Sequence, residues 1–116
     1  DSTIIQANMP FLWDSYVAGA RGVMATPTSC GGAFFQRFHE AFVSGDMKLA
    51  EQRYNEIILL DNAIDSGFMA SATELIRLQG IKNFAWRTRC GHNLSPARIR
   101  SIKGFYDWCV ANGLMK

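Results

Sequence analysis

Two short apolar segments with a helical pattern between them constrain the fold of this sequence more than any other feature. Residues 2–6 and 21–26 are rich in small and β-branched apolar side chains, which is typical of buried strands. Pro10 begins a run of apolar residues at helical spacing that ends at Gly19. Since only about a dozen residues separate the two segments, we expect parallel strands joined by a crossover helix, with Pro27 ending the second strand.

The rest of the chain has helical periodicity. Gly45 and Asp46 are typical of a helix end followed by the N-cap of the next helix. Further helices are expected over residues 69–79 and over residues 95–113, where Ser-Pro begins the helix and Gly ends it. Before Gly45, an aromatic stripe at helical spacing predicts a helix with one face buried in the core: Phe34, Phe35, Phe38 and Phe42.

Two strands cannot form an independent parallel sheet of useful size, so their apolar faces need further strands. We therefore expect an α/β fold in which this chain is the C-terminal part of a (β/α)8 TIM barrel. Residues 1–44 would supply the last two βα units of the barrel. Residues 45–116 would form a helical C-terminal extension.

Three segments carry a resemblance to a known family, in matching order. Residues 18–24, Ala-Gly-Ala-Arg-Gly-Val-Met, resemble the LGA-x-G-V-I segment that enters the eighth strand of dihydrodipicolinate synthase and N-acetylneuraminate lyase. Residues 42–51 resemble that family's A-x-x-x-G-D-x-x-x-A junction between late helices. Arg87-Thr88-Arg89 with Leu94-Ser95-Pro96 resembles its R-x-P…L-S-P-E approach to the terminal helix.

The resemblance implies a lyase or aldolase that makes or breaks a carbon–carbon bond next to a 2-oxo acid such as pyruvate. Family members use a lysine on the sixth strand, which forms a Schiff base with the ketone and needs no cofactor. That strand would precede Asp1, and we expect this chain alone to be inactive. The lysines of the chain fall on predicted helices, in a loop and at the end: Lys48, Lys103, Lys82 and Lys116.

The resemblance also implies substrate-binding positions at the carboxyl ends of the two strands. Ala7 and Asn8 follow the first strand, and Met24 and Thr26 fall where the family offers a backbone carbonyl and a hydroxyl. The family often has an acidic residue in the first of these loops, whereas this chain reads Ala7-Asn8-Met9. This departure argues against sialic acid as the substrate.

Other interpretations remain open. One is a hydratase-aldolase of an aromatic pyruvate derivative, and another, from a different class, is a non-catalytic helical interaction module. His39 and His92 are interpreted as packing or surface residues, and Arg87 and Arg89 as partners of acidic residues. The cysteines and His92 match no common zinc spacing, and no metal is expected.

Composition limits the partners. A net charge of +2 without a basic run gives no footprint for nucleic acid, and no apolar stretch reaches the roughly 20 residues of a membrane span. Three cysteines cannot all pair within the chain, which favours reduced cysteines and a cytoplasmic location. The expected partners are a small 2-oxo acid, the rest of the barrel and further copies in a homo-oligomer, for which the family suggests a tetramer and Trp13, Trp86 and Trp108 offer apolar surface.

Overall fold

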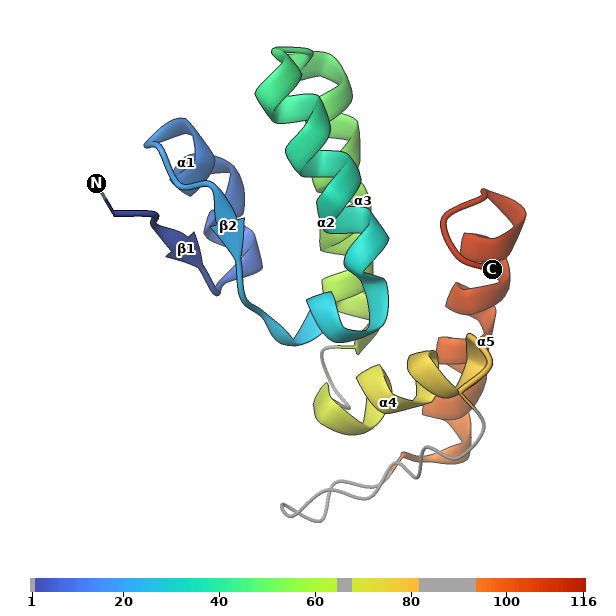
Figure 1. The fold of residues 1–116 in the computed structure, drawn as a ribbon. Coiled ribbons are helices and arrows are strands. Elements are labelled where there is room, and N and C mark those ends of the chain that lie inside the picture. Colours follow the sequence, from blue (N-terminus) through green and yellow to red (C-terminus); the bar gives the residue numbers. More distant parts are fainter. Residues whose placement is uncertain (1, 65–67, 82–93) are drawn as a thin grey trace. The chain divides into compact units, whose positions relative to one another are not determined.

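The computed structural model describes residues 2–64, 68–81 and 94–116, of which 73% are helical (Figure 1). The chain forms two compact units, Asp1–Asp61 and Asn62–Lys116, which are described separately. Within the described ranges, no helix combines the length and the apolar character that crossing a membrane requires.

The first unit begins with the predicted strand, helix, strand order. β1 and β2 pair in parallel, with Ile5 opposite Gly22 and Gln6 opposite Val23. This confirms the expected parallel pairing and the connection through a helix. The elements of the unit are β1 (Ile5–Gln6), the 3-10 helix η1 (Met9–Phe11), α1 (Leu12–Val17), β2 (Gly22–Val23), α2 (Thr26–Ser44) and α3 (Met47–Ile64).

The prediction of a TIM-barrel portion is wrong. The described residues contain only two strands, each two residues long, in a structure that is mostly helical. Barrel strands need several residues each to build a closed sheet with a packed interior. Ile4 and Ile5, expected to face a barrel core, are 63% and 51% exposed, and the buried apolar side chains lie on the helices instead.

Pro27 explains part of this difference, because it occupies the first turn of α2 rather than ending a long strand. A proline there needs no N–H, so the residue type fits both interpretations. α2 therefore begins eight residues before the aromatic stripe and is kinked at Gly31. A Cβ at Gly31 would lie 2.4 Å from Leu60 Cδ2, so glycine allows α3 to approach α2 closely at the kink.

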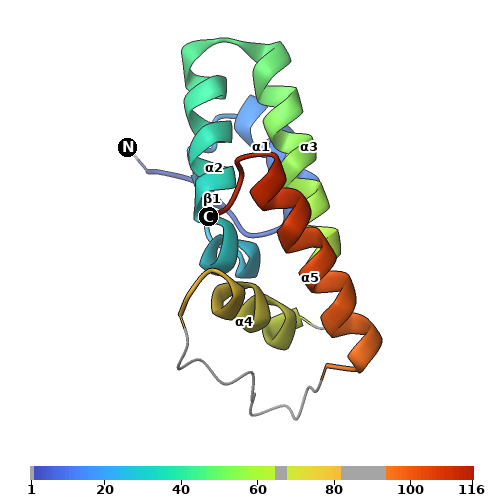
Figure 2. The same ribbon diagram turned by 90° about the vertical axis from the view of Figure 1, so that its right-hand side faces the viewer.

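α2 and α3 run side by side in two perpendicular views (Figures 1 and 2). The expected boundary between them is confirmed: Gly45 ends α2 in the left-handed conformation with φ of 86°, and Asp46 Oδ1 accepts a hydrogen bond from Leu49 N at 3.1 Å. The aromatic stripe is also confirmed as core, since Phe34, Phe35 and Phe38 are buried.

The core of the first unit is a cluster of aromatic rings. Phe38 lies at its centre and is fully buried, with its ring centroid 4.8 Å from that of Tyr16. Tilted and edge-to-face ring contacts of 5.2 to 6.2 Å join the other members. We refer to these five residues as the ring cluster: Trp13, Tyr16, Phe38, Phe42 and Tyr54.

The second unit is a pair of helices, α4 (Phe68–Leu78) and α5 (Pro96–Ala111), which contact each other. Ser95 caps α5 as predicted, because its Oγ accepts a hydrogen bond from Arg98 N at 3.1 Å. Arg98 also donates from Nη2 to the carbonyl of Ala63 at 2.6 Å. The unit buries small and aliphatic side chains: Ala70, Ala72, Leu75, Ile102, Cys109 and Leu114.

Candidate functional site

The substrate-binding residues predicted from the sequence lie at one edge of the strand pair. Because β1 and β2 are parallel and in register, the segments that follow Gln6 and Val23 leave the pair in the same direction. Met24 N donates to the carbonyl of Gln6 at 3.0 Å, which joins the two segments at this edge. We call the region formed by Ala7, Asn8, Met24 and Thr26 the strand edge.

The strand edge is open. Ala7 and Asn8 are exposed, but their backbone N–H groups donate to the side-chain oxygen of Gln6 at 2.9 and 2.8 Å, so Gln6 orders this loop. Met24 is 69% exposed, and its carbonyl accepts no hydrogen bond from the described residues. Thr26 is half-buried in the first turn of α2. The side chains at this edge therefore offer one amide and one hydroxyl to a ligand.

The described lysines do not belong to the strand edge. Lys48 is exposed in the first turn of α3, and Lys116 is at the end of the second unit. Lys103 lies on α5 and forms an ion pair with Asp107. Within the first unit, Lys48 is therefore not placed to act as an amine nucleophile at the carboxyl ends of β1 and β2.

A second feature of the first unit is an open hollow of about 310 Å³ between β2, α1 and α2. None of the four strand-edge residues lines it. Four of the five residues that α2 contributes, Thr28, Gly32, Phe35 and His39, follow one another at intervals of three or four, and Gln36 is adjacent to Phe35, which places them on one helix face. We call this the Arg21 hollow, and its lining consists of Tyr16, Arg21, Gly22, Val23, Thr28, Gly32, Phe35, Gln36 and His39.

Arg21 is the one permanently charged residue in this lining. Its Nη1 donates to the carbonyl oxygens of Tyr16 and Ala20 at 2.9 and 2.6 Å, at the C-terminal end of α1. Its Cζ lies 5.7 Å from the ring centroid of Tyr16 and 5.6 Å from that of Phe42. These contacts hold the guanidinium in one orientation at the border of the ring cluster.

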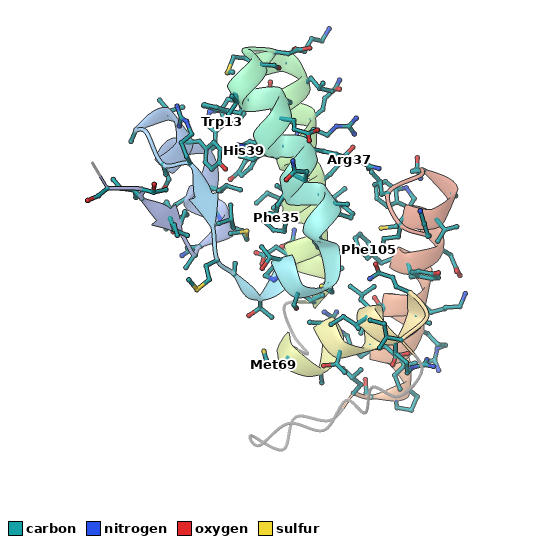
Figure 3. All side chains as sticks on the ribbon, in the orientation of Figure 1. Trp13, Phe35, Arg37, His39, Met69 and Phe105 are labelled. Atoms are coloured by element: carbon teal, nitrogen blue, oxygen red, sulfur yellow. The ribbon has the colours of Figure 1, made fainter. Side chains whose placement is uncertain are left out.

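Tyr16 and His39 form a hydrogen-bonded pair, with 2.9 Å between the phenol oxygen and Nδ1. Burial raises the pKa of Tyr16 above 10, and the positive charge of Arg21 opposes part of that increase. The phenol therefore keeps its proton at neutral pH, and the tautomer of His39 determines which of the two groups donates in this hydrogen bond. Figure 3 shows the side chains of His39 and Phe35 on the side of α2 that faces α1 and β2.

The sequence interpretation missed this arrangement. The sequence predicts a packing or surface role for His39, and its partner Tyr16 is 23 residues away. Thr28, Gln36 and His39 recur at helical spacing, and this pattern indicates a polar face on the helix. The phenylalanine residues on the same helix form a stronger pattern, which predicts only the buried face.

Several predictions concern residues outside the described ranges, namely Lys82, Trp86, Arg87, Arg89, Cys90 and His92. In the described ranges, no group of three or more His, Cys, Asp or Glu residues is arranged to hold a metal ion. Cys30 is buried, and this burial raises the pKa of its thiol to about 12. The thiol of Cys30 is therefore a core side chain rather than a nucleophile.

Comparisons with protein-family models, with curated proteins and with solved structures find no match for this chain.

Proposed function

We propose that this chain is part of a lyase or aldolase that makes or breaks a carbon–carbon bond next to a 2-oxo acid. The carrying observation is that one segment of the sequence resemblance, residues 18–24, contains β2, which pairs in parallel with β1, and that the common edge of the pair presents Asn8, Met24 and Thr26 together. The Met24 carbonyl and the Thr26 hydroxyl would position the oxo acid. The imine-forming lysine would come from polypeptide outside these 116 residues.

Exposed apolar side chains beside the strand pair support this proposal. Met24, Ile4 and Ile5 are each more than half exposed, and so are Phe11 and Val17 on the neighbouring helical segments. Large apolar side chains that are this exposed are typical of a surface that other polypeptide covers. Such a cover would also limit the premature hydrolysis of reactive intermediates by solvent.

Borohydride trapping tests the proposal directly. The protein translated from the complete reading frame that contains this sequence is incubated with pyruvate and sodium borohydride, and its intact mass is measured. We expect the mass of one reduced pyruvate to be added, with peptide mapping placing it on a lysine outside these 116 residues. Acetate replaces pyruvate in the control and should add nothing. An unmodified protein, or an adduct on Lys48 or Lys103, would overturn the proposal.

The role of the strand edge is tested in the same protein by Thr26→Val, which removes the hydroxyl at constant shape. We expect KM for the 2-oxo acid to rise about tenfold, the loss that corresponds to one hydrogen bond. Ser44→Ala at the far end of α2 removes a hydroxyl that bonds only the carbonyl of Ala41, and KM should not change. Equal KM values for the two variants would remove Thr26 from the site.

The same exposed apolar surface favours a second candidate, a non-catalytic helical module that binds another protein through the β1, α1 and β2 region. This candidate predicts no covalent adduct in the trapping experiment. It also predicts that Met24→Asp abolishes a stable complex without affecting any turnover of 2-oxo acids.

A further inference from the structure

We propose that the Arg21 hollow binds the carboxylate of a small organic acid that has an apolar body, at a site separate from the strand edge. Arg21 and His39 would hold the carboxylate, and Phe35 and Tyr16 would cover the apolar part. The inference goes beyond the proposed lyase function, because none of the residues assigned to that reaction lines the hollow.

The donors of Arg21 are arranged for a carboxylate. Nη1 is occupied by the two backbone carbonyls at the end of α1, while Nε and Nη2 have no partner among the described residues. These two nitrogens present parallel N–H groups, the geometry that matches both oxygens of a carboxylate. Because the guanidinium is already fixed by two hydrogen bonds and two rings, little further side-chain order is lost when an anion binds.

His39 contributes its second ring nitrogen, Nε2, to the proposed site. When Tyr16 donates to Nδ1 of a neutral imidazole, the ring proton is on Nε2. When the imidazole is protonated, both nitrogens carry a proton and Nδ1 donates to the phenol oxygen. Nε2 has no partner among the described residues, so in both of these arrangements its N–H is available to an acceptor.

The charge of the lining selects an anion of low charge. No carboxylate is among the nine lining residues, and the nearest acidic group in the sequence of α2, Glu40, accepts a hydrogen bond from Gln36 at 2.7 Å. A single arginine balances one negative charge. A phosphate dianion would need a second permanent cation, which this lining does not contain.

The size and the walls of the hollow select the rest of the ligand. A volume of about 310 Å³ is at the lower end of the range for small-molecule sites, and it fits a single ring or a short branched chain. Phe35 is buried beneath the hollow and offers an apolar wall. Gly32 has open space where a Cβ would project, so this part of the helix does not block entry.

An NMR titration of the isotope-labelled chain with sodium benzoate tests the proposal. We expect saturable shifts of the backbone amides of Gly22, Val23 and Gly32, with a dissociation constant on the order of 1 mM for so small a ligand. Benzamide has the same shape without the charge and should bind at least about tenfold more weakly. Equal affinities for benzoate and benzamide, or shifts that do not saturate, would overturn the proposal.

Three variants locate the site. Arg21→Gln should weaken benzoate binding at least about tenfold, whereas Lys48→Gln makes the same charge change on the exposed start of α3 and should alter it less than about twofold. Since Arg21 also stabilises the end of α1, Gly32→Leu provides a second variant. Its side chain would fill the hollow without meeting other atoms at Cβ, so binding should be lost while the spectrum remains that of the folded chain. Unchanged binding in a folded Gly32→Leu variant would refute the site.

Discussion

The two compact units bury different kinds of side chain. The first unit buries aromatic rings beside the proposed site, and the second buries a carboxylate among small and aliphatic side chains. The first unit is centred on the ring cluster, and its polar groups, Arg21 and His39, lie at the border of those rings. The second unit packs α4 against α5 with small and aliphatic residues, and it buries Glu74 at 2% exposure. Aromatic packing thus positions the polar groups of the first unit, while the second unit buries a carboxylate that is paired with an arginine of the same helix.

The largest expected effect comes from removing the centre of the ring cluster. Phe38→Ala deletes a fully buried ring that contacts four other aromatic residues, so we expect a loss of about 3–5 kcal/mol in the free energy of unfolding. This loss is measured by urea unfolding, monitored through the hydrogen exchange of peptides from residues 2–61. Phe105→Ala is the control in the second unit, where a half-buried ring stacks on Trp108, and it should cost roughly 1 kcal/mol. Equal losses would contradict the contrast between the units.

The buried charge of the second unit gives the next largest effect. Glu74 is bound by Arg77, with Nη2 to Oε1 at 2.7 Å, and this hydrogen bond raises the pKa of Arg77 above its usual value. Arg77→Ala should cost about 1–3 kcal/mol, because it leaves a carboxylate without its partner in a buried position. Unfolding of residues 94–116 is measured by the same hydrogen exchange experiment.

Lys103→Ala provides a matched control for Arg77→Ala. Lys103 and Asp107 also form an ion pair within one helix, but both side chains are more than half exposed, so the loss should stay below about 0.5 kcal/mol. Adding Glu74→Leu to Arg77→Ala should restore much of the stability, since the buried group is then apolar. A double variant as unstable as Arg77→Ala alone would show that packing, rather than charge, determines the effect.

The cap of α5 gives a smaller effect. Ser95→Ala removes the acceptor for Arg98 N, and we expect the free energy of unfolding of the second unit to fall by about 1 kcal/mol. Ser101→Ala, at an exposed position inside the same helix, should leave the stability unchanged or slightly higher. Circular dichroism during thermal unfolding measures both variants, and similar melting temperatures would argue against a stabilising role for the cap.

These helix ends could be predicted from the sequence because their signals are local. Gly45, Asp46 and Ser95 act on backbone groups within four residues, so each residue type alone indicates its conformation or bond. The burial of the phenylalanine stripe was predictable for a related reason, since its periodicity is contained within one helix. The parallel strand pair followed from two short apolar segments and from the length of the connection between them.

The fold class could not be predicted in the same way. The order of short motifs carries no information on strand length, and the two strands are only two residues long. Pro27 fits both a strand end and a helix start, and the structure uses it for the helix. The Arg21 hollow depends on contacts between residues distant in sequence, such as Tyr16 and His39, which no local pattern specifies.

The smallest expected effect concerns the pH dependence of the first unit. Burial raises the pKa of both Tyr16 and Tyr54, and for Tyr54 the carboxylates of Asp14 and Asp61 raise it further. Each phenol therefore binds its proton more tightly in the folded than in the unfolded chain, where the pKa is about 10. This contribution to stability is complete below about pH 10 and is lost as the pH rises through the folded-state values.

Urea midpoints measured between about pH 8 and pH 11 reveal this decline in stability. Hydrogen exchange should show that the decline is confined to residues 2–61. Tyr16→Phe removes one of the two phenols and should reduce the slope of the urea midpoint against pH. The double variant with Tyr54→Phe should reduce this slope further. Because both substitutions also delete hydrogen bonds and lower the stability at neutral pH, the slope is compared between variants and the absolute midpoint is not. If the slope of the urea midpoint against pH is unchanged in the double variant, other groups cause the loss of stability at high pH. Burial in the ring cluster would then not disfavour the ionised forms of Tyr16 and Tyr54.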